Sequence, residues 1–175
     1  MFGRTLAVLA VLGGLFVPAS GFGRSSAPHF VFPGTKADRV VVYKSERQLD
    51  LYREGQLLKS YHASLGRVPV GPKRREGDGR TPEGSYVIDG RLTRTPYFLG
   101  LHVSYPDAED RAQAAAMGVS PGGSILIHGV GWVKGGVTDA QARTDWTDGC
   151  IAVTNAEIAE IWVAVDDGTP IDIRP

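Results

Sequence analysis

The sequence predicts a mostly β fold with two or three short helices. Short runs alternate apolar and polar residues, which is the pattern of half-buried strands. Turn residues separate these runs, and the chain of 175 residues holds 23 glycines and 11 prolines, which favours many turns over a helical bundle. Helical spacing with start and stop signals occurs in two segments.

The first strands follow a loose, polar region. Val40–Tyr43 is β-branched and aromatic, and Leu49 and Leu51 alternate with polar residues. A turn at Glu54-Gly55 leads into a third run, up to Leu65, whose apolar residues fall mostly on one face. This alternation around a turn predicts antiparallel hairpins.

The middle of the chain begins with a glycine-rich, charged loop at 71–84. Strands are predicted at 85–89, at 97–105 and at 124–129. Between the last two, a short helix is predicted over 106–118, closed by a glycine.

A second helix follows the cysteine. Thr154 and Glu157 form the Thr-x-x-Glu pattern of a capping box. Apolar residues then recur at helical spacing, and Gly168 is predicted to end the helix. The last strand is predicted at 169–173.

Length and charge suit one domain that does not bind nucleic acid. Hydrophobic residues make up 42 % of the chain, and 19 basic residues balance 19 acidic ones. Nucleic acid requires a basic face. Residues 1–19 are interpreted as a signal peptide, with an uncleaved membrane anchor as the alternative. Residues 20–37 are interpreted as a linker and 38–175 as the domain, exported to the periplasm or cell envelope.

Cys150 is the single cysteine of the chain. Exported proteins usually pair their cysteines, so an unpaired thiol is a candidate reactive group. The alternative is a buried cysteine that packs as a small hydrophobe. Gly149 before it allows the backbone to approach a ligand closely.

A thiol with an ordinary pKa of about 8.5 needs a base in order to attack a carbonyl. His128 ends a predicted strand and is followed by Gly129, so its ring can project from a rim. It is the preferred base, and the alternative is a core histidine bonded to a turn. His62 and His102 lie within strands, and His102 is expected to be structural. The histidines lack close metal-ligand spacing, so no metal and no cofactor are predicted.

Four motifs in order resemble the L,D-transpeptidase catalytic domain of the YkuD type, over roughly residues 38–174. "IHG" at 127–129 and "TDGCI" at 147–151 are similar to its histidine-glycine and Ser/Thr-x-Gly-Cys motifs. "GDGRTPEGSY" at 77–86 is similar to its Gly-Asp-x-x-Thr-Pro-x-Gly segment. "SYPDAED" and "GCIAVTNAEIAEIW" resemble its YafK-like branch.

The resemblance implies a β-sandwich with the cysteine at one rim and peptidoglycan peptide stems as substrate. Cys150 would attack the carbonyl at stem position three and release D-alanine. The acyl group of the resulting thioester would then pass to an amine or to water. His128 would be the base, the Gly129 carbonyl would hold its ring, and the Gly149 and Cys150 amides would form the oxyanion hole.

Two positions depart from the family pattern. Asp148 stands where many members have histidine or arginine, and Ala152 where many have arginine. Such an arginine suits substrate carboxylates, and Lys73, Arg74, Arg75 or Arg80 of the charged loop could take its place. Arg80, Thr147 and Asp148 are the candidate substrate-binding residues. For the charged loop that holds Arg80, simple solvation is the alternative. Asp148 is expected to raise the pKa of the thiol, because like charges disfavour ionisation.

Three functions remain open at this point. The first is a transpeptidase, and the second is a hydrolase of the same mechanism, which trims stems or releases a protein linked to peptidoglycan. The third is a non-catalytic module that binds the cell wall. Peptidoglycan stems are the expected partner, a cell-wall-linked protein is a second candidate, and the chain is expected to be a monomer.

Overall fold

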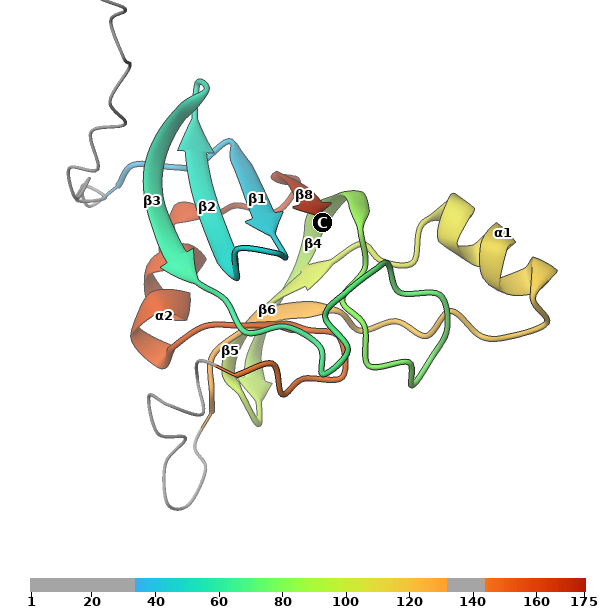
Figure 1. The fold of residues 1–175 in the computed structure, drawn as a ribbon. Coiled ribbons are helices and arrows are strands. Elements are labelled where there is room, and N and C mark those ends of the chain that lie inside the picture. Colours follow the sequence, from blue (N-terminus) through green and yellow to red (C-terminus); the bar gives the residue numbers. More distant parts are fainter. Residues whose placement is uncertain (1–33, 132–143) are drawn as a thin grey trace, which may run out of the picture.

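The computed structural model describes residues 34–131 and 144–175 (Figure 1). The predicted signal peptide, residues 1–19, and residues 20–33 of the predicted linker lie outside the described residues. Strands and two helices follow one another along the described chain: β1 (Arg39–Tyr43), β2 (Gln48–Arg53), β3 (Gln56–His62), β4 (Gly84–Thr95), β5 (Phe98–Val103), α1 (Ala108–Ala116), β6 (Leu126–His128), β7 (Ile151–Ala152), α2 (Asn155–Ala164) and β8 (Pro170–Arg174). The mostly β fold with short helices is confirmed.

The long strand β4 connects two halves of the sheet, whose strand order is β3-β2-β1-β8-β4-β5-β6-β7. Residues 84–87 pair with β8, whereas residues 88–95 pair with β5. The register shifts between Ile88 and Gly90 and again between Leu92 and Thr95. Bulges of this kind bend a strand, so β4 leaves one half of the sheet and enters the other.

One hydrophobic core draws side chains from every named strand and from α2. The alternation in the sequence decides which side chains enter it. Val40 and Val42 of β1, and Leu49 and Leu51 of β2, are fully buried. Burying each aliphatic side chain contributes about 1.5–3 kcal/mol, so this alternation fixes which face of β1 and β2 meets the core.

Both helices begin with a capping box. Asp107 caps α1 and exchanges hydrogen bonds with Asp110, and Thr154 caps α2 and exchanges them with Glu157. Helix α2 packs against β5. Helix α1 buries only Ala114 and projects from the body of the molecule on the side away from α2 (Figure 1).

Two element ends differ clearly from the sequence-based prediction, and one strand is new. Helix α2 ends at Ala164 and not at Gly168, because Val165 takes an extended conformation and bridges to Ala37. The strand predicted at 85–89 continues as far as Thr95. Strand β7 was not predicted. Within the described residues, no helix is both long and apolar enough to span a bilayer.

Candidate functional site

The candidate site is built on two short parallel strands, β6 and β7. Their register aligns His128 with Ala152, and the same register sets Cys150, two residues earlier, beside Leu126. Side chains two residues apart on a strand share a face. Cys150 and His128 are therefore diagonal neighbours on one face of the strand pair, although they are distant in sequence.

His128 is buried and held in one orientation. Its Nδ1 lies 2.6 Å from the carbonyl oxygen of Gly129, and because a carbonyl only accepts, Nδ1 carries the proton. Tyr97 stacks on the ring with centroids 4.4 Å apart, and Trp146 meets it edge-on at 5.8 Å. Burial lowers the pKa of His128, against a smaller rise from the bond to Gly129, so the imidazole is neutral at neutral pH.

Cys150 is a half-buried free thiol, and it immediately precedes strand β7. Its Sγ lies 3.6 Å from the Ser124 carbonyl oxygen. Burial raises the pKa of the thiol, and the carboxylate of Asp148 adds to the rise, whereas the Leu126 backbone and the Lys73 ammonium oppose it. The resting thiol is therefore protonated. Asp148 acts in the expected direction, but burial has the larger effect.

A tight turn presents the cysteine. Gly149 has φ +135, and a Cβ on it would lie 2.6 Å from the Arg80 carbonyl oxygen, so the position requires glycine. Thr147 is 4 % exposed. Its Oγ1 accepts the Gly149 N–H at 3.1 Å and donates to the Cys150 carbonyl at 2.7 Å. The Thr147 hydroxyl thus holds the turn together, and the Gly149 amide is directed at Thr147.

The two charged candidates for substrate binding have protein partners. Asp148 is 77 % exposed and pairs with the guanidinium of Arg67, which is also exposed. The Arg80 guanidinium donates to the Val70 carbonyl. The backbone of Arg80, and not its side chain, faces the turn at Gly149.

The charged loop at 71–84 is fastened to strand β1. Lys44 is 2 % exposed. Its Nζ donates to the carbonyls of Gly71 and Thr81, at 2.7 and 2.9 Å, and to the carboxylate of Glu83 at 2.7 Å. One buried ammonium therefore ties both ends of the loop to the sheet. Burial lowers the pKa of Lys44, against the opposing effect of Glu83.

Another histidine lies on the strand next to β6, where the register aligns His102 with Leu126. His102 pairs with Asp89, with Nδ1 and Oδ1 2.5 Å apart, at a partly exposed position, which agrees with a structural role. Across residues 34–131 and 144–175, no cluster of three or more histidine, cysteine, aspartate or glutamate side chains is arranged to hold a metal ion.

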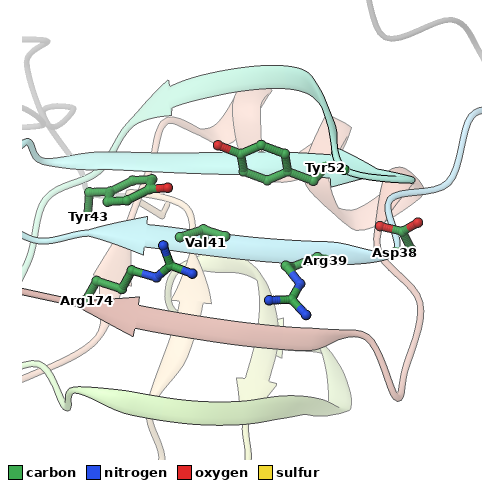
Figure 2. Close-up of a pocket in the computed structure, with 7 residues that line it drawn as sticks. Asp38, Arg39, Val41, Tyr43, Tyr52 and Arg174 are labelled. Atoms are coloured by element: carbon green, nitrogen blue, oxygen red, sulfur yellow. The ribbon is translucent and has the colours of Figure 1, made fainter.

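A groove of about 590 Å³ lies on the face of β1, β2 and β8 that points away from the core. Figure 2 shows Tyr43 and Tyr52 on one side of it and Arg39 and Arg174 on the other. Both arginines pair with Asp172, at 2.8 and 3.5 Å. The charges of this groove are thus satisfied within the protein, and its lining includes neither Cys150 nor His128.

The fold and the order of these residues along it define a class. The YkuD family, described as the L,D-transpeptidase catalytic domain, matches residues 37–173. Because the match covers most of the chain, the chain belongs to this family.

Individual relatives place the chain within the family. It is 32 % identical over 129 residues to YafK of Escherichia coli K12, which is named as a candidate L,D-transpeptidase. The match covers 70 % of this chain and 45 % of YafK, so the chain spans about half the length of the curated relatives it matches.

Solved structures agree. The helical cell shape determining protein Pgp2 of Campylobacter jejuni is 26 % identical with a TM-score of 0.60, over 79 % of this chain and 48 % of Pgp2. Bd1075 of Bdellovibrio bacteriovorus is 24 % identical with a TM-score of 0.57, over 79 % of this chain and 48 % of Bd1075. An L,D-transpeptidase of Mycobacterium smegmatis shares the fold at 17 % identity and a TM-score of 0.51, over 79 % and 59 % of the two chains.

Sequence reasoning missed three neighbours of the site. Tyr97 stacks on His128 from the residue before β5, and no motif marks it. Ser124 offers its carbonyl to the thiol, and a backbone group leaves no trace in a sequence. Lys73 was considered only together with the other basic residues of the charged loop, as a substrate-binding or solvated side chain, and its burial, at 5 % exposed, was not predicted.

Proposed function

We propose that this domain is an exported cysteine acyltransferase that acts on the peptide stems of peptidoglycan. Cys150 is the nucleophile and His128 is the general base. The sulfur attacks the carbonyl of the third stem residue, and the proton of the thiol passes to Nε2 of His128. The C–N bond to the terminal D-alanine then breaks, the amine leaves with that proton, and a thioester on Cys150 remains. An amine acceptor attacks the thioester and frees the thiol.

The register of β6 against β7 is the observation that carries this proposal. It makes Cys150 and His128 neighbours on one face. A nucleophile and a base on adjacent strands, with the base oriented by a third group, are the arrangement that activated nucleophiles require. The third group here is the Gly129 carbonyl. It fixes the proton on Nδ1 and leaves Nε2 with a free lone pair.

The pKa directions support proton transfer during attack. Burial disfavours the charged form of each partner, so it raises the pKa of Cys150 and lowers that of His128. A neutral thiol beside a neutral imidazole is therefore favoured over a resting ion pair. The tetrahedral oxyanion relies first on the Cys150 amide, because the Gly149 amide is directed at Thr147.

Product analysis tests the reaction. Purified protein is incubated with disaccharide-tetrapeptides, with and without a tripeptide-bearing acceptor, and the products are separated and weighed. Release of D-alanine together with cross-linked dimers supports transpeptidation. Release of D-alanine without dimers would mean that water, and not an amine, is the acceptor, so the enzyme would be a hydrolase. Cys150→Ala, which removes one small side chain, is the control and should give neither product while keeping the wild-type melting temperature. A folded wild-type protein that releases no D-alanine would favour a non-catalytic cell-wall module.

Export is part of the proposal, because peptidoglycan lies outside the cytoplasm. The apolar run of residues 6–17 and the small residues before Ser20 support a cut after Ala19. N-terminal sequencing of the protein recovered from the periplasm should begin near Ser20. A mature chain that begins at Met1 contradicts the cleaved leader.

A further inference from the structure

The charged loop at 71–84 has a buried ion pair at its centre. The Nζ of Lys73 lies 2.9 Å from Oδ1 of Asp78, and the two side chains are 4 % and 8 % exposed. The neighbouring Arg74 and Arg75 are exposed. Removing two charges from water is costly unless good geometry and further hydrogen bonds offset the cost, so this pair is not explained by simple solvation of the loop.

Asp78 is the hydrogen-bond centre of the loop. Its Oδ1 also accepts the N–H of Arg80 at 3.1 Å, and its Oδ2 accepts the N–H groups of Arg74 and Arg75 at 2.8 and 3.1 Å. Burial by itself raises the pKa of Asp78, but these backbone bonds and Lys73 together hold it below the usual value. The carboxylate therefore stays ionised and fixes the loop backbone.

The segment that Asp78 fixes packs against the turn that presents the cysteine. The Arg80 carbonyl occupies the space where a Cβ of Gly149 would lie. The hydroxyl of Thr81 accepts the Gly66 N–H at 3.0 Å, and Gly66 forms a bridge with Thr147 of the same turn. A shift of this segment would move the backbone on which Gly149 rests.

A chain of contacts leads from Lys73 to the cysteine: Lys73 pairs with Asp78, Asp78 accepts the Arg80 N–H, and the Arg80 carbonyl packs on Gly149, the residue before Cys150. Two charged side chains act on the thiol besides burial. Asp148, on the cysteine's own turn, is exposed and pairs with Arg67, whereas Lys73, from the charged loop, is buried. Lys73 lowers the pKa of the thiol, against burial and Asp148.

We propose that the Lys73–Asp78 pair is a positioning device for the Cys150 site, in which Asp78 fixes residues 78–81 against Gly149 and Lys73 holds a buried positive charge behind the turn that presents the reacting sulfur. The effect on turnover rests on the proposed function, whereas the effect on thiol reactivity does not.

Alkylation of Cys150 by iodoacetamide tests the role of Lys73. Lys73→Met keeps the length of the side chain and removes the charge, so alkylation at pH 7 should slow by about twofold or more. Arg75→Met removes an exposed charge from the same loop and is the matched control, which should react at the wild-type rate. Equal rates in wild type and Lys73→Met, or equal slowing in both variants, overturn the proposal.

Asp78→Asn separates positioning from charge. It removes a negative charge, so alkylation should stay the same or become faster. Turnover should fall about tenfold or more, because small misplacements of a site are costly. Both carboxylate oxygens of Asp78 accept backbone N–H groups. The asparagine side chain has only one oxygen, so its NH₂ group would face some of these N–H donors. Normal turnover in Asp78→Asn, or alkylation slowed as in Lys73→Met, contradicts the two roles.

Folding is checked by thermal melting of each variant. If a single variant does not fold, the double variant Lys73→Met/Asp78→Asn is measured instead, since it leaves no unpaired buried charge. Wild-type alkylation and turnover in the folded double variant overturn the proposal, and lowered turnover supports it. If even the wild-type protein shows no acyl transfer, the proposed function fails, and the alkylation rates still decide the role of Lys73.

Discussion

Burial acts on His128 and Cys150 in opposite directions, and this defines the resting site. The histidine loses its proton more easily than an ordinary imidazole, and the thiol holds its proton more firmly. Of the two states open to such a pair, thiolate with imidazolium or thiol with imidazole, burial favours the neutral one. The base is thus ready to accept a proton, and the thiolate forms only when the carbonyl is in place.

The pH profile of kcat/KM follows from these directions. His128 must be neutral to act, and its pKa is lowered, so the acid limb should lie below about 6.5, the ordinary histidine value. In His128→Ala, turnover should fall by about two to four orders of magnitude. Water then enters beside the thiol, so the alkylation inflection should move down towards about 8.5. An acid limb above 6.5, or near-normal turnover in His128→Ala, would show that His128 is not the base.

Gly149 tests how closely the turn must fit. In Gly149→Ala, the new methyl meets the Arg80 carbonyl and the backbone is strained at φ +135, so both stability and turnover should fall. Gly168→Ala is the matched control. It also places a side chain at positive φ, +87, but meets nothing within 4 Å, so it should cost about 1 kcal/mol of strain and leave turnover unchanged. Urea unfolding and turnover assays compare the two, and equal losses would contradict the contact with Arg80.

At the scale of elements, the sequence predicted those features, such as helix caps and hairpin turns, that depend on residues close together in the chain. The capping box at Thr154 and the hairpin turn at Glu54-Gly55 were predicted from neighbouring residues, whereas the capping box at Asp107 is a finding of the structure. Strand β7 could not be found in this way, because two residues have no period. Its existence depends on β6 and on Ser64, which bridges to Ala152 from the other side. The diagonal placement of Cys150 and His128 therefore depends on tertiary structure. The strand-end position of His128 and the family resemblance both paired it with the thiol, but neither predicted this geometry.

Helix α2 follows directly on the cysteine strand, so its cap matters to the site. Thr154→Ala removes the hydroxyl that accepts the Glu157 N–H. Urea unfolding should show a loss of about 1 kcal/mol. Asp107→Ala makes the same kind of change in α1, which buries only Ala114, so it should leave turnover unchanged. A larger loss of turnover in Asp107→Ala than in Thr154→Ala would contradict this ranking.

At the scale of the whole molecule, the shifted pKa values of His128 and Asp78 give stability a pH dependence. The folded-state pKa of His128 lies below its unfolded value of about 6.5. Below pH 6.5 the unfolded chain binds more protons, so the free energy of unfolding should fall as the pH drops from 6.5. The folded-state pKa of Asp78 is also lowered. Its contribution to the free energy of unfolding is lost at lower pH, as the pH falls through that folded-state pKa. Urea unfolding between pH 7.5 and 5 checks the first step, which His128→Gln should remove. A flat profile in the wild type contradicts the buried neutral imidazole.

At the same scale, the sequence predicted the fold class but not which charged residues are buried. The apolar alternation was enough for a mostly β fold, because burial of residues such as Val40 and Leu51 decides which faces meet. The charged loop shows where this reasoning ends. Lys73 and Arg75 carry the same positive charge on the same loop, yet Lys73 is buried beside Asp78 whereas Arg75 is exposed, and only the path of the backbone decides this.

The most direct test of the central claim is the mass of the intact protein during turnover. Wild type mixed with a tetrapeptide stem and quenched in acid should gain the mass of a tripeptide acyl group, placed on Cys150 by peptide mapping. The adduct should be absent in Cys150→Ala, and it should disappear from wild type when an amine acceptor or time for hydrolysis is supplied. Release of D-alanine with no adduct on Cys150 under any quench, or release that persists in Cys150→Ala, would contradict a thioester mechanism on this cysteine.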